Sequence, residues 1–274
     1  MKREYGQFFS LPPFIGRIQP GYNRPPFLEA IFDCRCLLKK QECEILLDSR
    51  NRIGAITLPL EEGKTVDVVI KEFQIKGANK LKSTFLPSKA FKAWQGGMVL
   101  MEKGIKTPYP IAFLEKRKRV FLDQSFYLTK KVEDIEEIRF LFLRLSPPDL
   151  CKLLTALARY LSLCHKKGIL HRDLSDGNIL VGKERTGKFK FYLIDTNRIR
   201  TKKHIRILIG LKNLIRLGIP LRYQRFFLEK YLEIGHVNDF RWAWYRANKI
   251  TYTWFIKGKK KLRLKKLAQR LKIQ

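Results

Sequence analysis

The chain has 274 residues, of which 45% are hydrophobic, and a formal net charge of +32. This length suits one large domain or one domain of two lobes, with a substantial buried core. The five cysteines are an odd number, which excludes a fully paired disulfide framework and favours a reducing cytosol. No uncharged apolar run reaches 18 residues, so no transmembrane helix is expected. The first twenty residues lack the apolar core of a secretory signal, so no such signal is expected.

Residues 1–26 are rich in proline, glycine and aromatic residues, and we expect them to form an extended arm. Residues 27–134 contain short β-branched and apolar runs bounded by turn residues, which is typical of strands, together with one helical segment. The expected strands are 42–47, 53–58, 66–73, 109–115 and 120–130, and the expected helix is 88–102.

Residues 135–256 are predicted to be mainly helical. The clearest helix is 150–166, where leucines recur at helical spacing after two prolines and Asp149. The other expected helices are 135–145, 202–217, 223–232 and 238–254. Residues 257–274 are predicted to be a basic amphipathic tail.

A polar motif follows helix 150–166. It reads His171-Arg172-Asp173, then Asn178 five residues later, and a short strand ends at Asp195. This is the spacing used in phosphoryl transfer, where one carboxylate accepts the proton of the attacking hydroxyl and an Asn and a second Asp hold magnesium. Side chains at the ends of regular elements are held in fixed directions by a rigid scaffold. This favours a catalytic role for the motif over an ordinary solvated polar loop.

A candidate phosphate-binding cation lies earlier in the chain. Lys71 stands in the β-branched run of the 66–73 strand. A lysine among apolar residues is costly unless it meets an anion, although an exposed lysine that alternates outward from the strand remains the simpler alternative.

These residues resemble those of the lipopolysaccharide kinases, the Kdo/heptose kinases of the lipopolysaccharide core, from about residue 40 to about residue 235. The shared motifs are Val69-Ile70-Lys71, GIKTPYP at 104–110, His171-Arg172-Asp173 with Asn178-Ile179-Leu180, Leu193-Ile194-Asp195, and the segment from Arg206 to Leu214. The resemblance implies an α+β, bilobal protein-kinase-like fold. Its N-lobe would be an antiparallel sheet with one helix (27–134), followed by a hinge at 131–134 and a mainly helical C-lobe (135–256).

The resemblance also implies roles for individual residues. Asp173 would be catalytic, and Lys71, Asn178 and Asp195 would bind the cofactors ATP and Mg²⁺, the metal being held by Asn178 and Asp195. The acceptor would be a sugar hydroxyl of lipopolysaccharide core or lipid A–Kdo, at the inner face of the cytoplasmic membrane.

Several positions depart from the protein-kinase pattern. Ser175 stands where Ser/Thr protein kinases carry a lysine, and Thr196 follows the metal-binding Asp where they carry Phe. Both favour a sugar, lipid or other small-molecule kinase. Ala93 stands where the family's helix carries the Glu that pairs with the phosphate-binding Lys, and Gly96 and Gly97 weaken that helix by about 1 kcal/mol each. This departure keeps open a catalytically weak kinase-like module.

The positive charge is concentrated toward the C-terminus. From Thr196 onward there are 22 Lys and Arg against 3 Asp and Glu, which places +19 of the +32 in 79 residues. Such a field attracts polyanions. Residues 257–274 alternate cations with leucines, which favours an anionic membrane surface as a partner. The resemblance implies an anionic glycolipid substrate. The alternatives are a kinase of protein or of another small molecule, and a catalytically weak kinase-like module that binds anionic membrane or nucleic acid. The oligomeric state is unknown.

Overall fold

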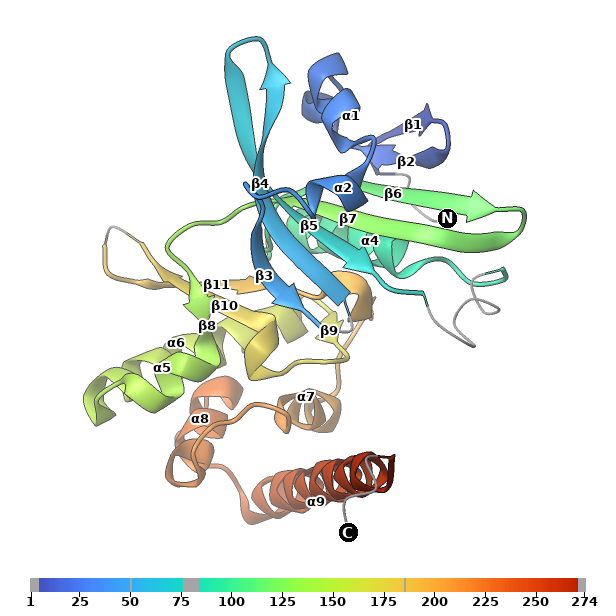
Figure 1. The fold of residues 1–274 in the computed structure, drawn as a ribbon. Coiled ribbons are helices and arrows are strands. Elements are labelled where there is room, and N and C mark those ends of the chain that lie inside the picture. Colours follow the sequence, from blue (N-terminus) through green and yellow to red (C-terminus); the bar gives the residue numbers. More distant parts are fainter. Residues whose placement is uncertain (1–4, 50, 76–83, 185, 271–274) are drawn as a thin grey trace. The chain divides into compact units, whose positions relative to one another are not determined.

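The computed structural model describes residues 5–49, 51–75, 84–184 and 186–270 (Figure 1). The chain divides into two compact units. Unit 1 comprises Met1–Ile135 and Tyr192–Ile199, and unit 2 comprises Glu136–Phe191 and Arg200–Gln274.

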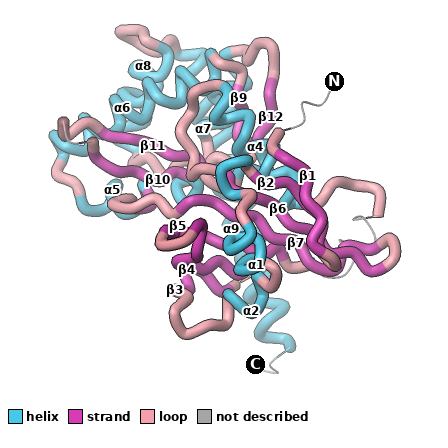
Figure 2. The backbone as a smooth tube through the Cα atoms, turned by 90° about the horizontal axis from the view of Figure 1, so that it is seen from above, coloured by secondary structure: helices cyan, strands magenta, loops and turns pink. Residues whose placement is uncertain are grey.

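Within the described residues, unit 1 is built on a seven-stranded antiparallel sheet with the order β1-β2-β6-β7-β5-β4-β3. Figure 2 shows β1, β2, β6 and β7 side by side. The strands are β1 (Gln7–Leu11), β2 (Phe14–Ile18), β3 (Glu44–Asp48), β4 (Asn51–Glu61), β5 (Lys64–Phe73), β6 (Pro110–Lys118) and β7 (Phe121–Lys130). The region expected to be an extended arm therefore contains the β1–β2 hairpin, which pairs with β6 through β2.

The two faces of this sheet carry different cores. Val68 and Ile70 of β5 are fully buried in a cluster that includes α1 (Pro25–Ile31) and α2 (Cys34–Leu37). Phe73 is buried in a second cluster with Trp94 of α4 (Lys89–Glu102). Since side chains alternate along a strand, Lys71 points to the same face as Phe73, which is the face that α4 covers.

Unit 2 is mainly helical. Its helices are α5 (Ile138–Arg144), α6 (Pro147–Lys166), α7 (Ile207–Leu214), α8 (Gln224–Leu232) and α9 (Asp239–Arg270). Its strands are β8 (Glu136–Glu137), β9 (Ile169–His171), β10 (Ile179–Lys183), β11 (Phe189–Leu193) and β12 (Ile199–Thr201), the last two of which each extend into the residues assigned to unit 1.

Helix α6 is the core element of unit 2. The Ser146 hydroxyl accepts from the backbone N–H of Asp149 and caps the first turn. Leu153, Leu154 and Leu157 lie on one face and are fully buried. Gly168 follows the helix with a φ of 73°, a backbone angle that favours glycine, and the chain turns there into β9 and the polar motif.

Helix α9 is longer than the sequence predicted. A helix was expected to end at Trp254 before a separate tail, but one continuous helix runs from Asp239 to Arg270. The last four residues of the predicted tail, 271–274, lie outside the described residues. None of the described helices combines the length and the apolar character needed to cross a membrane.

Candidate active site

Lys71 and Asp195 meet within unit 1. The Lys71 ammonium donates a 2.6 Å hydrogen bond to Oδ1 of Asp195, a residue 124 positions later in the chain. The two side chains are 17% and 24% exposed, so the ion pair is partly shielded from solvent. The ammonium also lies 5.1 Å from the centre of the Phe73 ring. The pair therefore brings together an ammonium group that could bind phosphate and a carboxylate that could bind a metal ion.

The segment before Asp195 is held by residues of the GIKTPYP motif. The backbone N–H of Leu193 donates to the oxygen of Lys106 at 3.1 Å, and the Thr107 hydroxyl donates to the Leu193 oxygen at 2.8 Å. Asp195 itself adopts the left-handed conformation, with φ 55° and ψ 45°. A non-glycine residue in that region is strained by about 1–3 kcal/mol, and such strain gathers at functional sites.

The segment after Asp195 packs directly on α4. The Thr196 hydroxyl donates to the backbone oxygen of Ala93 at 2.7 Å. One turn further along the helix, a Cβ atom on Gly96 would overlap the backbone oxygen of Thr196. Gly97 is confined on its own side, since its Cβ would lie 2.7 Å from Pro110 and from the Tyr127 hydroxyl. The small residues of α4 therefore permit close approach to the site segment, which the sequence had presented as a weakness of the helix.

Ala93 explains how the helix operates without its glutamate. The residue is 2% exposed and lies in the cluster with Trp94 and Phe113, so a longer side chain would have to displace buried neighbours. In this chain the ammonium of Lys71 pairs with Asp195 itself, and α4 is fixed to the neighbouring residue through its backbone.

Asp173 and Asn178 meet within unit 2. The Asn178 side-chain amide donates to the backbone oxygen of Asp173 at 2.7 Å, and the backbone N–H of Asp173 donates to Nδ1 of His171 at 3.2 Å. The backbone N–H of Asn178 donates to Ser175 at 2.9 Å. These bonds close the polar motif into one compact loop, in which His171 acts as scaffold.

A buried polar network supports this loop. Asn213 of α7 donates to the backbone oxygen of His171 at 2.8 Å and contacts Nε2 of His165 at 3.0 Å. The other nitrogen of His165 contacts the Tyr231 hydroxyl at 2.6 Å. Burial lowers the pKa of His165, so the ring is held in its neutral form. Helices α6, α7 and α8 thereby share one network that ends on the loop.

Sequence reasoning missed one residue of the site. The guanidinium of Arg216 contacts the Asp173 carboxylate and donates to the backbone oxygen of Arg172 at 3.3 Å. Its Nε donates to the hydroxyl of Tyr252 on α9 at 3.2 Å. Arg216 was one cation among many in a basic stretch, and nothing in its spacing distinguished it.

The backbone around Arg216 is anchored by two charged side chains. Lys249 of α9 donates to the oxygens of Ile215 and Leu217, at 3.1 and 2.7 Å. Both carboxylate oxygens of Asp176 accept from the backbone N–H of Gly218, at 2.8 and 2.9 Å. Burial lowers the pKa of Lys249 to about 8 and raises the pKa of Asp176, while the attraction between the two opposes both shifts.

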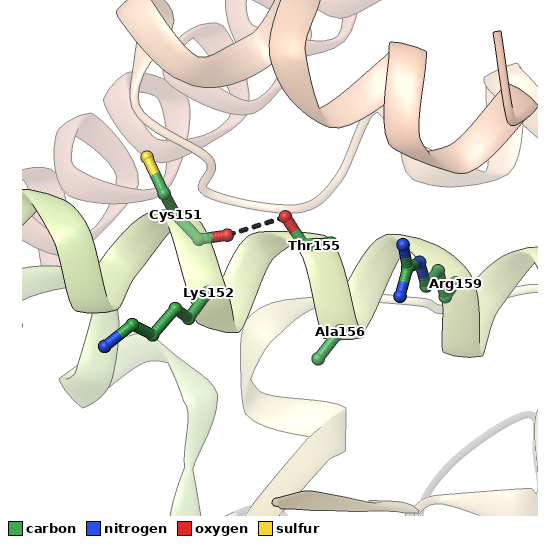
Figure 3. Close-up of a pocket in the computed structure, with 5 residues that line it drawn as sticks. All are labelled: Cys151, Lys152, Thr155, Ala156 and Arg159. Atoms are coloured by element: carbon green, nitrogen blue, oxygen red, sulfur yellow. Dashed lines mark hydrogen bonds between the residues drawn. The ribbon is translucent and has the colours of Figure 1, made fainter.

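One surface hollow lies apart from these groups. Figure 3 shows it along α6, and its lining residues are Cys151, Lys152, Thr155, Ala156 and Arg159. It contains none of the four predicted site residues. Its one drawn hydrogen bond, from the Thr155 hydroxyl to the backbone oxygen of Cys151 at 2.8 Å, is internal to the helix.

The comparisons with known proteins decide the family. The model of the lipopolysaccharide kinase (Kdo/WaaP) family matches residues 78–225, which is more than half of the chain. The chain belongs to this family. It is therefore a kinase, a phosphotransferase that uses ATP, and the sequence-based prediction of family and enzyme class is confirmed.

A solved structure supports the fold. The chain is similar to a structure described as WaaP in complex with acyl carrier protein, with 18% sequence identity and a TM-score of 0.56. The match covers 83% of this chain and 97% of that chain. WaaP has a protein-kinase-like fold, so the predicted α+β kinase-like class is confirmed. A search of curated proteins found no match.

Proposed function

We propose that this lipopolysaccharide kinase transfers the γ-phosphoryl group of ATP to a sugar hydroxyl of lipopolysaccharide core or lipid A–Kdo. The observation that carries the proposal is the 2.6 Å pair between Lys71 and Asp195. Two groups 124 residues apart, one suited to phosphate and one to a cation, are brought together on the sheet face that α4 covers. The anionic glycolipid is the acceptor class that the family implies.

Magnesium fits the donor atoms that we assign to it. Asp195 offers carboxylate oxygens. The Asn178 amide nitrogen donates to the backbone oxygen of Asp173, which leaves the amide oxygen of Asn178 as the metal ligand. These are hard oxygen ligands of the kind that Mg²⁺ prefers, and Mg²⁺ is commonly held by one or two side chains plus substrate phosphates. In the described residues no cluster of three or more His, Cys, Asp or Glu is placed to bind a metal. Bound magnesium would neutralise charge on the phosphates.

The chain's own residues then have distinct tasks. Asp173 orients the acceptor hydroxyl and takes its proton as the oxygen attacks the γ-phosphorus. A new O–P bond forms while the bond from the γ-phosphorus to the β-bridging oxygen breaks, and ADP leaves. Lys71 holds the nucleotide phosphates, and the hydrogen bonds within the loop keep Asp173 in position.

We further propose that α9 docks the kinase on the anionic inner face of the cytoplasmic membrane. Its exposed residues form an apolar stripe at intervals of three and four, which is one helical face. The stripe consists of Phe240, Ala243, Ala247, Ile250 and Trp254. Phe240 is 66% and Trp254 75% exposed, whereas Tyr245 on the opposite face is fully buried.

Charge favours a lipid surface over a second copy of the chain. Helix α9 contains eleven Lys and Arg and one Asp, so two such helices would repel each other. The exposed residues Lys257, Lys259 and Lys261 follow directly after the stripe. Exposed tryptophan and phenylalanine beside a cationic run suit the boundary between anionic headgroups and acyl chains. Trp242 differs, because it is half-buried and stacks on Tyr245.

Phosphate transfer is tested directly. The purified chain is incubated with labelled ATP, Mg²⁺ and a panel of core glycolipids, and the label on each glycolipid is measured. We expect label on at least one core glycolipid, lost by about 10³-fold or more in Asp173→Asn and in Lys71→Met. Glu62→Gln removes an exposed carboxylate from a turn and serves as the matched control. Label on protein but on no glycolipid would overturn the proposed acceptor.

A further inference from the structure

We propose that Arg216 is a positioning residue for Asp173, and that Tyr252 of α9 holds Arg216 in place. The inference rests on the proposed role of Asp173 as the group that accepts the acceptor proton. It extends the active site of unit 2 from the polar loop to the C-terminal helix, and neither the sequence motif nor the family match identifies these two residues.

The guanidinium of Arg216 is bound on three sides. It contacts Oδ1 of Asp173, donates to the backbone oxygen of Arg172 at 3.3 Å, and donates from Nε to the Tyr252 hydroxyl at 3.2 Å. The guanidinium carbon also lies 5.2 Å from the centre of the Tyr252 ring, in cation–π range. A planar group with this many partners has a fixed orientation, so its N–H groups are aimed before substrate arrives.

The backbone that carries Arg216 is equally fixed. Lys249 binds the carbonyl oxygens of the residues on both sides of it, Ile215 and Leu217. The Leu217 side chain is fully buried, and Gly218 is tied to Asp176. Side chains from α9 and from the polar loop thus hold the loop 215–218 in place. This loop carries the guanidinium that contacts Asp173.

A cation at this point has a chemical task. Contact with Oδ1 stops the carboxylate from rotating and leaves Oδ2 to meet the acceptor hydroxyl. Arg216 and Asp173 are 30% and 32% exposed, so solvent screens the pair only in part. Ser/Thr protein kinases carry a lysine two residues after this Asp, where this chain has Ser175. Arg216 supplies a cation to the same carboxylate from a different segment.

The kinetic test separates Arg216 from Tyr252. Arg216→Gln should lower kcat for glycolipid phosphorylation about 10- to 100-fold, with the KM for ATP within about twofold. Arg216→Lys keeps the charge and should recover part of kcat. Tyr252→Phe keeps the ring and loses the hydroxyl, and should lower kcat about 2- to 10-fold. Because Tyr252 acts through Arg216, the double variant should be no slower than Arg216→Gln alone.

Three kinetic results would overturn the proposal. The first is a kcat for Arg216→Gln within twofold of the unsubstituted chain. The second is Arg216→Lys as slow as Arg216→Gln. The third is full additivity in the double variant. Arg222→Gln removes an exposed arginine whose described contact is the Tyr223 ring, and this control should leave kcat unchanged.

A readout that needs no activity decides the case if no glycolipid is labelled, which would count against the proposed function alone. The backbone N–H groups of Asp173 and Asn178 are both hydrogen-bonded inside the loop. Arg216→Gln should speed their hydrogen exchange about tenfold or more, and Arg222→Gln should not. Unchanged exchange in Arg216→Gln, at a thermal midpoint equal to that of the control, would show that Arg216 does not position the loop.

Discussion

The Thr196 hydroxyl and the backbone oxygen of Ala93 are joined by a 2.7 Å hydrogen bond, so the residue next to Asp195 is fixed to the backbone of α4. This bond requires that the helix and the site segment come within backbone contact. Gly96 makes this possible, because a Cβ atom there would overlap the Thr196 oxygen.

We therefore expect Gly96→Ala to destabilise the fold. The substitution gains about 1 kcal/mol in helix propensity, but the forced separation costs about 1–3 kcal/mol or more. Displacement of Thr196 would also move Asp195, so kcat should fall about tenfold or more. Urea unfolding and phosphorylation kinetics measure the two effects.

Gly258→Ala is the matched control for Gly96. Gly258 lies in α9 with no atom within 4 Å of its added Cβ. Its replacement should raise the free energy of unfolding by about 0.5–1 kcal/mol. If Gly96→Ala is equally stabilising and fully active, the close approach of α4 does not matter for the site.

Restoring the family's helix glutamate should not help this chain. Ala93→Glu would place a carboxylate at a position that is 2% exposed, within a cluster with Trp94 and Phe113. Burial of an unpaired charge costs several kcal/mol, so we expect loss of stability and of activity. Gln95→Glu, on a half-buried position of the same helix, should cost less than about 1 kcal/mol. A more active Ala93→Glu would show that the missing glutamate limits catalysis.

The sequence predicted those parts of the fold whose patterns are local. Strand β5, with Lys71 near its end, was predicted from its run of β-branched residues. Helix α6 was predicted from leucines at helical spacing after two prolines and Asp149. The β1–β2 hairpin was missed because its short strands lie among prolines and glycines, and it is stabilised by pairing with β6. The end of α9 was misplaced because Gly258 weakens local helix propensity without ending the helix.

The candidate site shows the same limit. The motif residues Asp173, Asn178 and Asp195 are recognisable by spacing, because their roles depend on short loops at strand ends. Arg216 and the close approach of Gly96 depend on contacts between segments more than 40 residues apart, and neither carries a local pattern. From sequence alone, a glycine in a helix indicates only low helix propensity. The close packing that Gly96 allows is visible only when the backbone of Thr196 is in place.

The buried histidine predicts a dependence of stability on pH. Burial lowers the pKa of His165 in the folded state, whereas the unfolded chain has the ordinary value near 6.5. Below pH 6.5 the unfolded state therefore binds more protons, and the free energy of unfolding falls as pH decreases. His165→Gln should lose most of the difference in urea stability between pH 7.5 and pH 5.5. The exposed His204 provides the control, and His204→Gln should keep that difference.

Membrane docking through α9 should depend on its exposed aromatic residues. Trp254→Ala with Phe255→Ala should weaken flotation with vesicles containing phosphatidylglycerol about tenfold or more, and phosphatidylcholine vesicles should bind weakly even without substitution. Phe140→Ala removes a 52% exposed ring from α5 and should have no effect. Equal binding of both vesicle types, or flotation unchanged in the Trp254/Phe255 variant, would contradict the α9 proposal.

Lys249 should contribute a pH dependence to stability in the alkaline range. Its folded pKa is about 8, against 10.5 for the ordinary side chain, because its ammonium is partly buried against the Ile215 and Leu217 oxygens. Between these values the Lys249 side chain binds more protons in the unfolded state, so its own contribution to the free energy of unfolding rises with pH from about 8 to 10.5. The buried thiols of Cys34 and Cys164, whose pKa burial raises, contribute a fall over the same range. After allowance for partial exposure, we expect the Lys249 contribution to rise by about 1–2 kcal/mol. Lys249→Met should abolish this contribution in urea titrations, whereas the exposed Lys257→Met should not. A free energy of unfolding that changes with pH in Lys249→Met just as it does in the unsubstituted chain would contradict this contribution.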